Sequence, residues 1–223
     1  MSIDTRKIER DVEAAVGADT EAIAERVRAI TLAALTEGRL DAQALRGVMN
    51  AVLEGAQKGA MPVDAERSAA FKEAMRGLDE AMASAAQATQ LAMQEAIGRS
   101  AEFSREGLRQ SLEPFSSLEN DLIGALADAA RKTTGQARDT LSELAEHMRH
   151  SGTAAGERVR DAVAELARTS SSLAWSQVEG GVQTLRNQAD LLASLAAGVL
   201  RGFADRLHPV DSATDTERKD TPR

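Results

Sequence analysis

The stretch from Ala70 to Ala96 reads AFKEAMRGLDEAMASAAQATQLAMQEA and decides the fold. Small residues recur along it in steps of four or three, which is the spacing of one helix face. They are Ala70, Ala74, Gly77, Ala81, Ala85, Ala88, Ala92 and Ala96, with Phe71, Met75, Leu78 and Met82 running beside them. Side chains this small let a second helix backbone come close. The stretch therefore predicts one helix of a packed helical bundle.

The composition of the 223-residue chain favours helix and argues against a deep ligand pocket. Alanine, the strongest helix former, makes up roughly a fifth of the chain. Aromatic residues make up 2%, and the absence of Cys excludes disulfides and thiolate chemistry. Leu, Ile, Val and Phe together reach only about 20%. This low apolar content predicts a marginally stable monomer, helped by self-association or by a surface that it binds.

The charge and the first residues of the chain limit the partners and the location that we expect for it. The net charge is −8 and no long run of Lys and Arg occurs, so nucleic-acid binding is not expected. Residues 1–7 run into a charged helix and do not read as a signal peptide. No run approaches the roughly 18 apolar residues of a membrane span. We expect a cytoplasmic protein.

Residues 1–60 predict a short helical hairpin. Apolar residues at helical spacing over 23–34 are followed by Gly38, a frequent helix stop. Asp41 is placed to cap the next helix. Two helices joined by so short a connection lie antiparallel. The glycines and Pro62 that follow indicate a hinge before the rest of the chain.

Residues 64–207 predict a bundle of three long helices, at about 64–113, 115–150 and 154–207. The middle helix carries apolar residues with an eleven-residue period, which needs little supercoiling. The fold class that follows is all-α, an elongated and coiled-coil-like bundle of long amphipathic helices preceded by the short hairpin. The polar tail 208–223 predicts disorder.

Motifs that could carry chemistry are few. Carboxylates and histidines lie four apart on a helix at Glu143, Glu146, His147 and His150. A di-metal bundle needs a second such motif, and the chain has only 3 His, so a solvated charged face is the better interpretation. The serines 170–172 have no nearby His, and Trp175 is interpreted as a packed residue or an interface anchor. We expect no enzymatic activity, no catalytic or metal-binding residue and no cofactor.

The segment 191–200, LLASLAAGVL, is apolar on nearly every side and too short to span a membrane. Two interpretations stay open: the core of the bundle or a seam between copies, and adsorption to a lipid or polymer surface. Ser194, Gly198 and Gly202 add a ridge of small residues. The expected contact residues are Leu191, Leu192, Leu195, Val199, Leu200 and Phe203, helped by Phe71, Met75 and Met82.

The chain resembles the phasins, proteins that coat polyhydroxyalkanoate storage granules in bacteria. The resemblance spans most of residues 64–207 and lies in the size, the alanine-rich long helices, the amphipathic stripes, the absence of Cys and the mixed C-terminal tail. Three segments resemble an uncharacterised family of bacterial helical proteins, which implies no activity. They are LTEGRLD at 35–41, VLEGA at 52–56 and LAAGVLRGFA at 195–204.

The leading functional hypothesis is a non-enzymatic helical scaffold that self-associates and coats a hydrophobic granule or membrane surface. The alternative is a protein–protein interaction module that uses the hairpin of residues 1–60. A ligand-binding or di-metal bundle enzyme is a third hypothesis with less support. The expected partners are a second copy of the chain and an apolar surface, with no nucleic acid and no small-molecule substrate.

Overall fold

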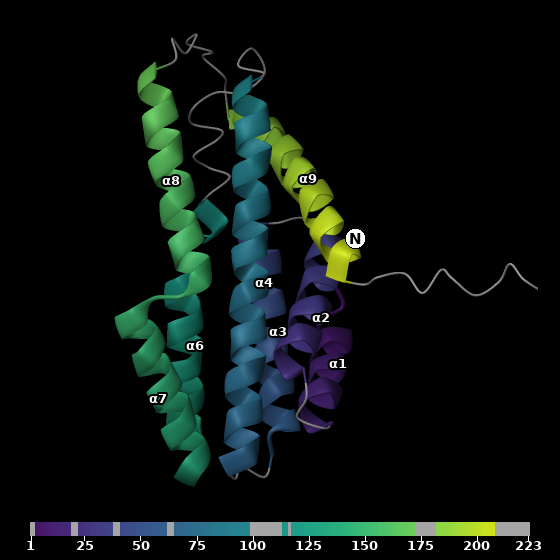
Figure 1. Ribbon diagram of the computed structural model, residues 1–223, viewed down its shortest axis with the longest axis vertical. Helices are drawn as coiled ribbons and strands as arrows, with labels where there is room; N and C mark the ends of the chain where they lie inside the picture. Colours follow the sequence, from purple (N-terminus) through teal and green to yellow (C-terminus); the bar gives the residue numbers. More distant parts are fainter. Residues whose placement is uncertain are drawn as a thin grey trace, which may run out of the picture.

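The computed structural model describes residues 3–18, 22–37, 41–61, 65–98, 113–115, 117–172 and 182–207. Within these ranges the chain is helical and forms no strand, which confirms the all-α class (Figure 1). The helices are α1 (Thr5–Gly17), α2 (Ile23–Glu37), α3 (Ala42–Gly59), α4 (Ala65–Gly98), α6 (Leu118–Lys132), α7 (Gly135–Ser151), α8 (Ala154–Ser172) and α9 (Val182–Leu207). The expected disordered tail and Trp175 lie outside the described residues, as do the side chains of 170–172.

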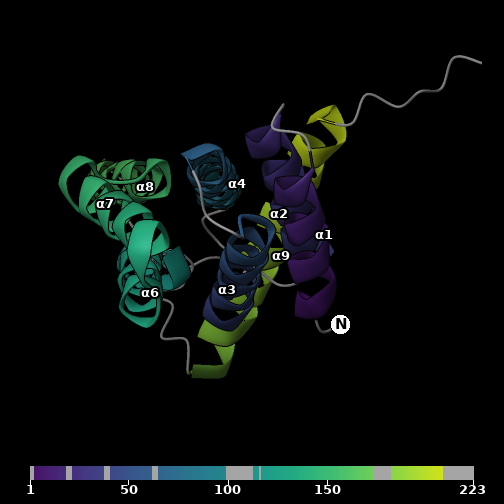
Figure 2. The same ribbon diagram turned by 90° about the horizontal axis from the view of Figure 1, so that it is seen from below.

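Helix α4 lies at the centre of the bundle, with α6, α7 and α8 on one side and α1 and α2 on the other (Figure 2). It packs mainly against α2, α8 and α9. Every residue of its small stripe is buried, as the spacing predicts. At Gly77 the backbone of α2 comes so close that a Cβ atom would lie 2.3 Å from the carbonyl oxygen of Ala24. The stripe is therefore the surface of α4 against which neighbouring helices pack closely.

The large apolar residues beside this stripe are also inside the protein. Phe71 is 4% exposed, Met75 0% and Met82 2%. The expectation that these three side chains help to contact an external surface is therefore wrong for this fold. They fill the core between α4 and the helices around it. Their spacing places them beside the stripe of small residues against which those helices pack.

The first three helices pack differently from the expected hairpin of α2 with α3. Helix α3 lies mainly along α1, and α2 lies mainly along α4. A Cβ atom on Gly55 would meet the carbonyl oxygen of Glu9 at 2.4 Å, and one on Gly59 would meet that of Glu13 at 2.6 Å. These two glycines let α3 approach α1 too closely for α2 to lie between them. The apolar core runs from α1 to α9 without interruption, so the expected boundary after residue 60 falls inside it.

The single helix expected over 115–150 is two helices. Thr133 and Thr134 are extended, with ψ of 167° and 164°, and Gly135 has a φ of +64°. β-branched residues and glycine are weak helix formers, which explains a break at this point. Helix α7 turns back along α6, so that Glu119 near the start of α6 bonds to Thr153 just beyond the end of α7. We call this pair the α6–α7 hairpin.

The single helix expected over 154–207 is also divided. Helix α8 lies on one side of α4 and α9 on the other, and residues 173–181 between them are outside the described residues (Figure 1). Both helices pack against α4. The apolar side of α9 lies in the core through Leu192, Ala196 and Leu200.

Two carboxylates join α4, α6 and the start of α8. Asp79 of α4 accepts hydrogen bonds from the backbone N–H groups of Ala154 at 2.8 Å and Ala155 at 3.1 Å. Glu119 of α6 accepts from the N–H of Thr153 at 2.8 Å. Together they satisfy donors at the first turn of α8 and place negative charge at its positive end. Burial raises the pKa of Asp79 above its ordinary value, although both backbone hydrogen bonds oppose this shift.

The raised pKa of Asp79 gives the fold a measurable pH dependence. A carboxyl group with a higher pKa in the folded than in the unfolded chain binds its proton more tightly when folded, so its ionisation weakens the fold. The stability of the wild type relative to Asp79→Asn should therefore rise as the pH falls from neutral through the raised pKa towards 3.8. Urea unfolding of both proteins at neutral pH and at about pH 4.5 measures this difference. A difference that stays constant or shrinks would contradict the expectation.

Candidate functional site

The apolar segment 191–200 of α9 faces two directions. Leu192, Ala196 and Leu200 are 0% exposed and belong to the core that α9 shares with α4 and α2. Val199 and Phe203 are half-buried against the same core. Leu191 is 55% exposed and Leu195 is 39% exposed. The core interpretation therefore accounts for one side of the segment and leaves the other side open.

The side of α9 that faces away from the core combines leucine with very small residues. We call Leu191, Ser194, Leu195, Gly198 and Gly202 the outer face of α9, and all five are exposed. A Cβ atom placed on either glycine would meet no atom of the described chain within 4 Å. The ridge of small residues noted in the sequence thus points outward, in contrast to the stripe of α4.

Two charged residues border the outer face of α9. Asp190 and Arg201 are both exposed, and they lie eleven residues apart, about three helical turns. They therefore project along the same edge of the helix. One guanidinium nitrogen of Arg201 donates to the carbonyl oxygen of Thr36 at 3.2 Å, which also ties this part of α9 to the end of α2. The apolar centre of the face has a negative charge before it and a positive charge after it.

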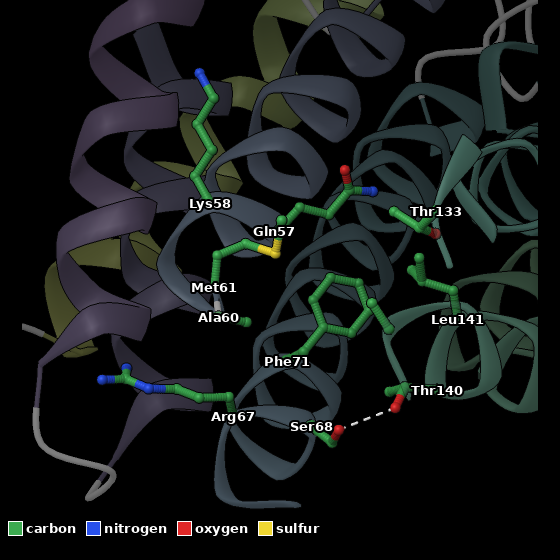
Figure 3. Close-up of a pocket in the computed structure, with 11 residues that line it drawn as sticks. Gln57, Lys58, Ala60, Met61, Arg67, Ser68, Phe71, Thr133, Thr140 and Leu141 are labelled. Carbon is green, nitrogen blue, oxygen red and sulfur yellow. Dashed lines mark hydrogen bonds between the residues drawn. The ribbon is translucent and has the colours of Figure 1, made fainter. Parts of the chain in front are cut away.

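A separate cavity of about 160 Å³ lies where α3 ends, α4 begins and α6 turns into α7 (Figure 3). Its apolar lining comes from Ala60 and Met61 after α3, Phe71 of α4, and Ala137 and Leu141 of α7. The hydroxyl groups of Ser68 and Thr140 are hydrogen-bonded at 3.0 Å along one side.

The charged residues around this cavity turn away from it. The amine of Lys58 and the guanidinium of Arg67 both point away from Phe71 (Figure 3). Lys58 forms an ion pair with Glu9, and Arg67 donates to the carbonyl oxygens of Gly59, Val16 and Gly17 at 3.3 to 3.4 Å. The amide of Gln57 points towards Thr133 at the edge. The interior of the cavity is thus apolar, with a small polar edge.

The sequence does not predict this cavity, and low aromatic content argues against one. Thr133 and Ala137, which line it, are two of the small members of the eleven-residue repeat of 118–148. Small side chains opposite the ring of Phe71 leave the space unfilled. The small size of these residues is visible in the sequence. Which of them face Phe71 depends on the break between α6 and α7.

The Glu and His residues of α7 lie on its solvent side. Glu143 pairs with Lys72 at 2.7 Å, and this hydrogen bond lowers the pKa of Glu143 below its ordinary value. Glu146 pairs with Arg149 and lies 3.3 Å from His150. Among the residues that the structure describes, no three His, Asp or Glu side chains gather as metal ligands. The helices as far as they are described also contain no segment long and apolar enough to cross a membrane.

Comparison with known proteins places the chain in a family without assigning it an activity. No curated protein and no solved structure matches it. One family model does match, over residues 1–209, which agrees with the resemblance to an uncharacterised family and adds no support to the resemblance to phasins. Because the match covers nearly the whole chain, the protein belongs to the family described as Family of unknown function (DUF6781).

Proposed function

We propose that the protein is a non-enzymatic helical scaffold that self-associates through the outer face of α9. The observation that carries the proposal is the exposure of Leu191 and Leu195 on a helix whose opposite side is fully buried. Single exposed leucines are ordinary on protein surfaces. Here the two lie one turn apart beside Ser194, Gly198 and Gly202, where a second helix could approach closely.

A second copy of the chain suits this face because the face is complementary to itself. Homodimers form mostly about a two-fold axis, so the two α9 helices would run antiparallel. An axis between residues 195 and 196 places Leu191 of one copy against Gly198 and Gly202 of the other. Leu195 then lies against Ser194 and Gly198 of the other copy. Each leucine would fill space that a glycine leaves open.

The charges agree with the same register. The antiparallel arrangement brings Asp190 of each copy opposite Arg201 of the other, and the pair occurs twice because of the symmetry. A guanidinium group has five N–H donors, so the bond from Arg201 to Thr36 leaves others for a carboxylate. Charge pairs at the edge of an interface set register more than they add affinity.

The expected result of replacing Leu195 is the loss of self-association. The wild type should sediment as a dimer at micromolar concentrations and Leu195→Asp as a monomer, because the change buries an unpaired carboxylate in the contact. Leu91→Asp is the matched control, since Leu91 is also 39% exposed but lies on α4. Analytical ultracentrifugation gives the masses. A monomeric wild type, or equal dimerisation by the wild type and Leu195→Asp, would refute the proposal.

The register has its own test. Asp190→Arg should weaken the dimer by about three- to tenfold, since two cations would then face each other. Asp190→Arg combined with Arg201→Asp exchanges the charges and should restore most of the affinity. If the double variant is no tighter than the single one, the antiparallel register is wrong even where dimers form.

Coating of a hydrophobic granule or membrane surface, as the resemblance to phasins implies, is the second candidate. It would use the same outer face, and the exposure of Leu191 and Leu195 supports it. The apolar part of the face is narrow and bordered by charge, which suits a second copy better than an extended surface. Co-sedimentation with neutral liposomes or polymer particles distinguishes the two. Particle binding by a monomeric wild type, lost in Leu195→Asp, would favour coating.

An interaction module in residues 1–60 has less support. Helices α1, α2 and α3 place their apolar sides in the core that they share with α4. A partner could reach the groove of about 540 Å³ between α1 and α2, which combines apolar residues such as Ile3 and Ile30 with the ion pair of Lys7 and Asp11. Within their described residues these three helices expose no leucine, in contrast to the outer face of α9.

A further inference from the structure

The α6–α7 hairpin shares the apolar core with the rest of the protein, and polar contacts lie at its borders. Arg46 of α3 lies 2.7 Å from Asp121 of α6, and Lys72 of α4 lies 2.7 Å from Glu143 of α7. The two helices of the hairpin contact each other far more extensively than they contact α3 or α4. The 160 Å³ cavity opens in this seam, between Phe71 on one side and Leu141 on the other.

We propose that this cavity binds a small neutral apolar molecule, about the size of a single aromatic ring or a six-carbon chain. The volume sets the size, because an apolar cavity of roughly 150 Å³ is known to hold one benzene molecule. The cavity here has about 160 Å³ and is open on one side. A sugar or nucleotide is too large, and its polar groups would find few partners.

The lining determines the charge of the ligand. Lys58 and Arg67, the two cations among the lining residues, point away from Phe71 and are bound to Glu9 and to backbone carbonyls. An anion inside would lose its hydration without gaining a counterion, which is costly. Water is also poorly held, because the interior offers few hydrogen-bonding groups. Gln57 and Thr133 at the edge suit one polar group at the end of an apolar ligand.

Binding has a structural consequence because the lining comes from both sides of the seam. A molecule that contacts Met61 and Phe71 on one side and Ala137 and Leu141 on the other adds apolar contact between the hairpin and the rest of the protein. Ligand that binds only the folded state raises its stability in proportion to the logarithm of concentration. The cavity would thereby make the docking of the α6–α7 hairpin dependent on an apolar metabolite.

The test uses the full chain with benzene as the probe and benzoate as its charged counterpart. Benzene should bind saturably with one site per chain, seen by ligand-detected NMR, and should raise the midpoint of thermal unfolding. Benzoate, with the same ring and one negative charge, should bind at least tenfold more weakly. Ala137→Leu should fill the cavity and weaken benzene binding more than tenfold. Gln136→Leu adds the same side chain at an exposed position of α7 and should leave binding unchanged.

Each outcome decides the proposal. Absence of saturable benzene binding by the wild type overturns it, as does unchanged binding by a folded Ala137→Leu. Circular dichroism reports whether that variant folds, and Ala137→Val takes its place if it does not. Equal binding of benzoate and benzene would show that the apolar lining does not select the ligand. Because the cavity is separate from α9, Leu195→Asp should bind benzene as the wild type does, whatever its oligomeric state.

Discussion

Replacing Gly77 by alanine is expected to lower the free energy of unfolding by about 1–3 kcal/mol, the range found when a packed core receives an extra carbon. Alanine normally stabilises a helix relative to glycine, so a loss here would have to come from packing. The added Cβ atom would lie 2.3 Å from the carbonyl oxygen of Ala24, which is backbone and has no rotamer to change. Helix α2 would have to move away from α4. Urea unfolding followed by circular dichroism measures the change.

The control is the same substitution at a glycine with open space around it. Gly124 lies within α6, and a Cβ atom there would meet no atom of the described chain within 4 Å. Gly124→Ala should therefore raise the free energy of unfolding by about 0.5–1 kcal/mol, through helix propensity alone. The two variants should differ in sign. If both stabilise the protein, α2 does not rest on α4 at Gly77.

Replacing Leu192 by alanine should lower the free energy of unfolding by about 2–4 kcal/mol, because a fully buried leucine leaves a cavity when it is shortened. Its chain neighbour Leu191 is 55% exposed, so Leu191→Ala should change the free energy of unfolding by less than about 0.5 kcal/mol. The pair compares identical chemistry on adjacent residues of one helix. It therefore measures which way α9 faces.

Protein concentration separates stability from self-association in this comparison. Below the concentration at which the wild type dimerises, only Leu192→Ala should be destabilised. At higher concentration Leu191→Ala should also lose stability relative to the wild type, because it weakens the proposed contact between copies. Equal losses for both variants in the monomer would show that α9 does not dock through the side that carries Leu192.

The parts of the fold that the sequence predicts well are those where local spacing is sufficient. The stripe from Ala70 to Ala96 keeps one helix face over many turns, and the close approach at Gly77 follows from its small side chains. The partner of that face does not follow from spacing. The short connection at Gly38 suggests that α2 pairs with α3, yet Gly55 and Gly59 seat α3 on α1.

The breaks within the long helices are harder to predict because the apolar repeat continues through them. Thr133 fits the eleven-residue period, although it is extended in the structure. Two β-branched residues followed by Gly135 are the local sign of a helix break. The contacts that α7 makes by folding back along α6 stabilise the broken conformation. The cavity beside Phe71 depends on this reversal, and therefore no pattern within one helix could have predicted it.

The sequence alone does not predict which of the candidate contact residues of α9 are buried and which are exposed. Leu191, Leu192 and Leu195 are equally apolar, and the sequence treats them as one block. The structure buries Leu192 and exposes the other two, because one side of α9 rests on α4 and α2. Leu192 therefore stabilises the fold, whereas Leu191 and Leu195 are exposed and accessible to a second copy or an apolar surface.

The position of α9 against α2 and α4 also bears on how the chain is made. Residues 23–98, which include both neighbours, leave the ribosome about a hundred residues before α9 is complete. At a synthesis rate of about 5–20 residues per second, that interval is on the order of ten seconds. During this time the sides of α2 and α4 that α9 will cover are open to water and to other nascent chains. A chaperone that shields apolar helix surfaces would meet this protein at that stage, before α9 closes the core.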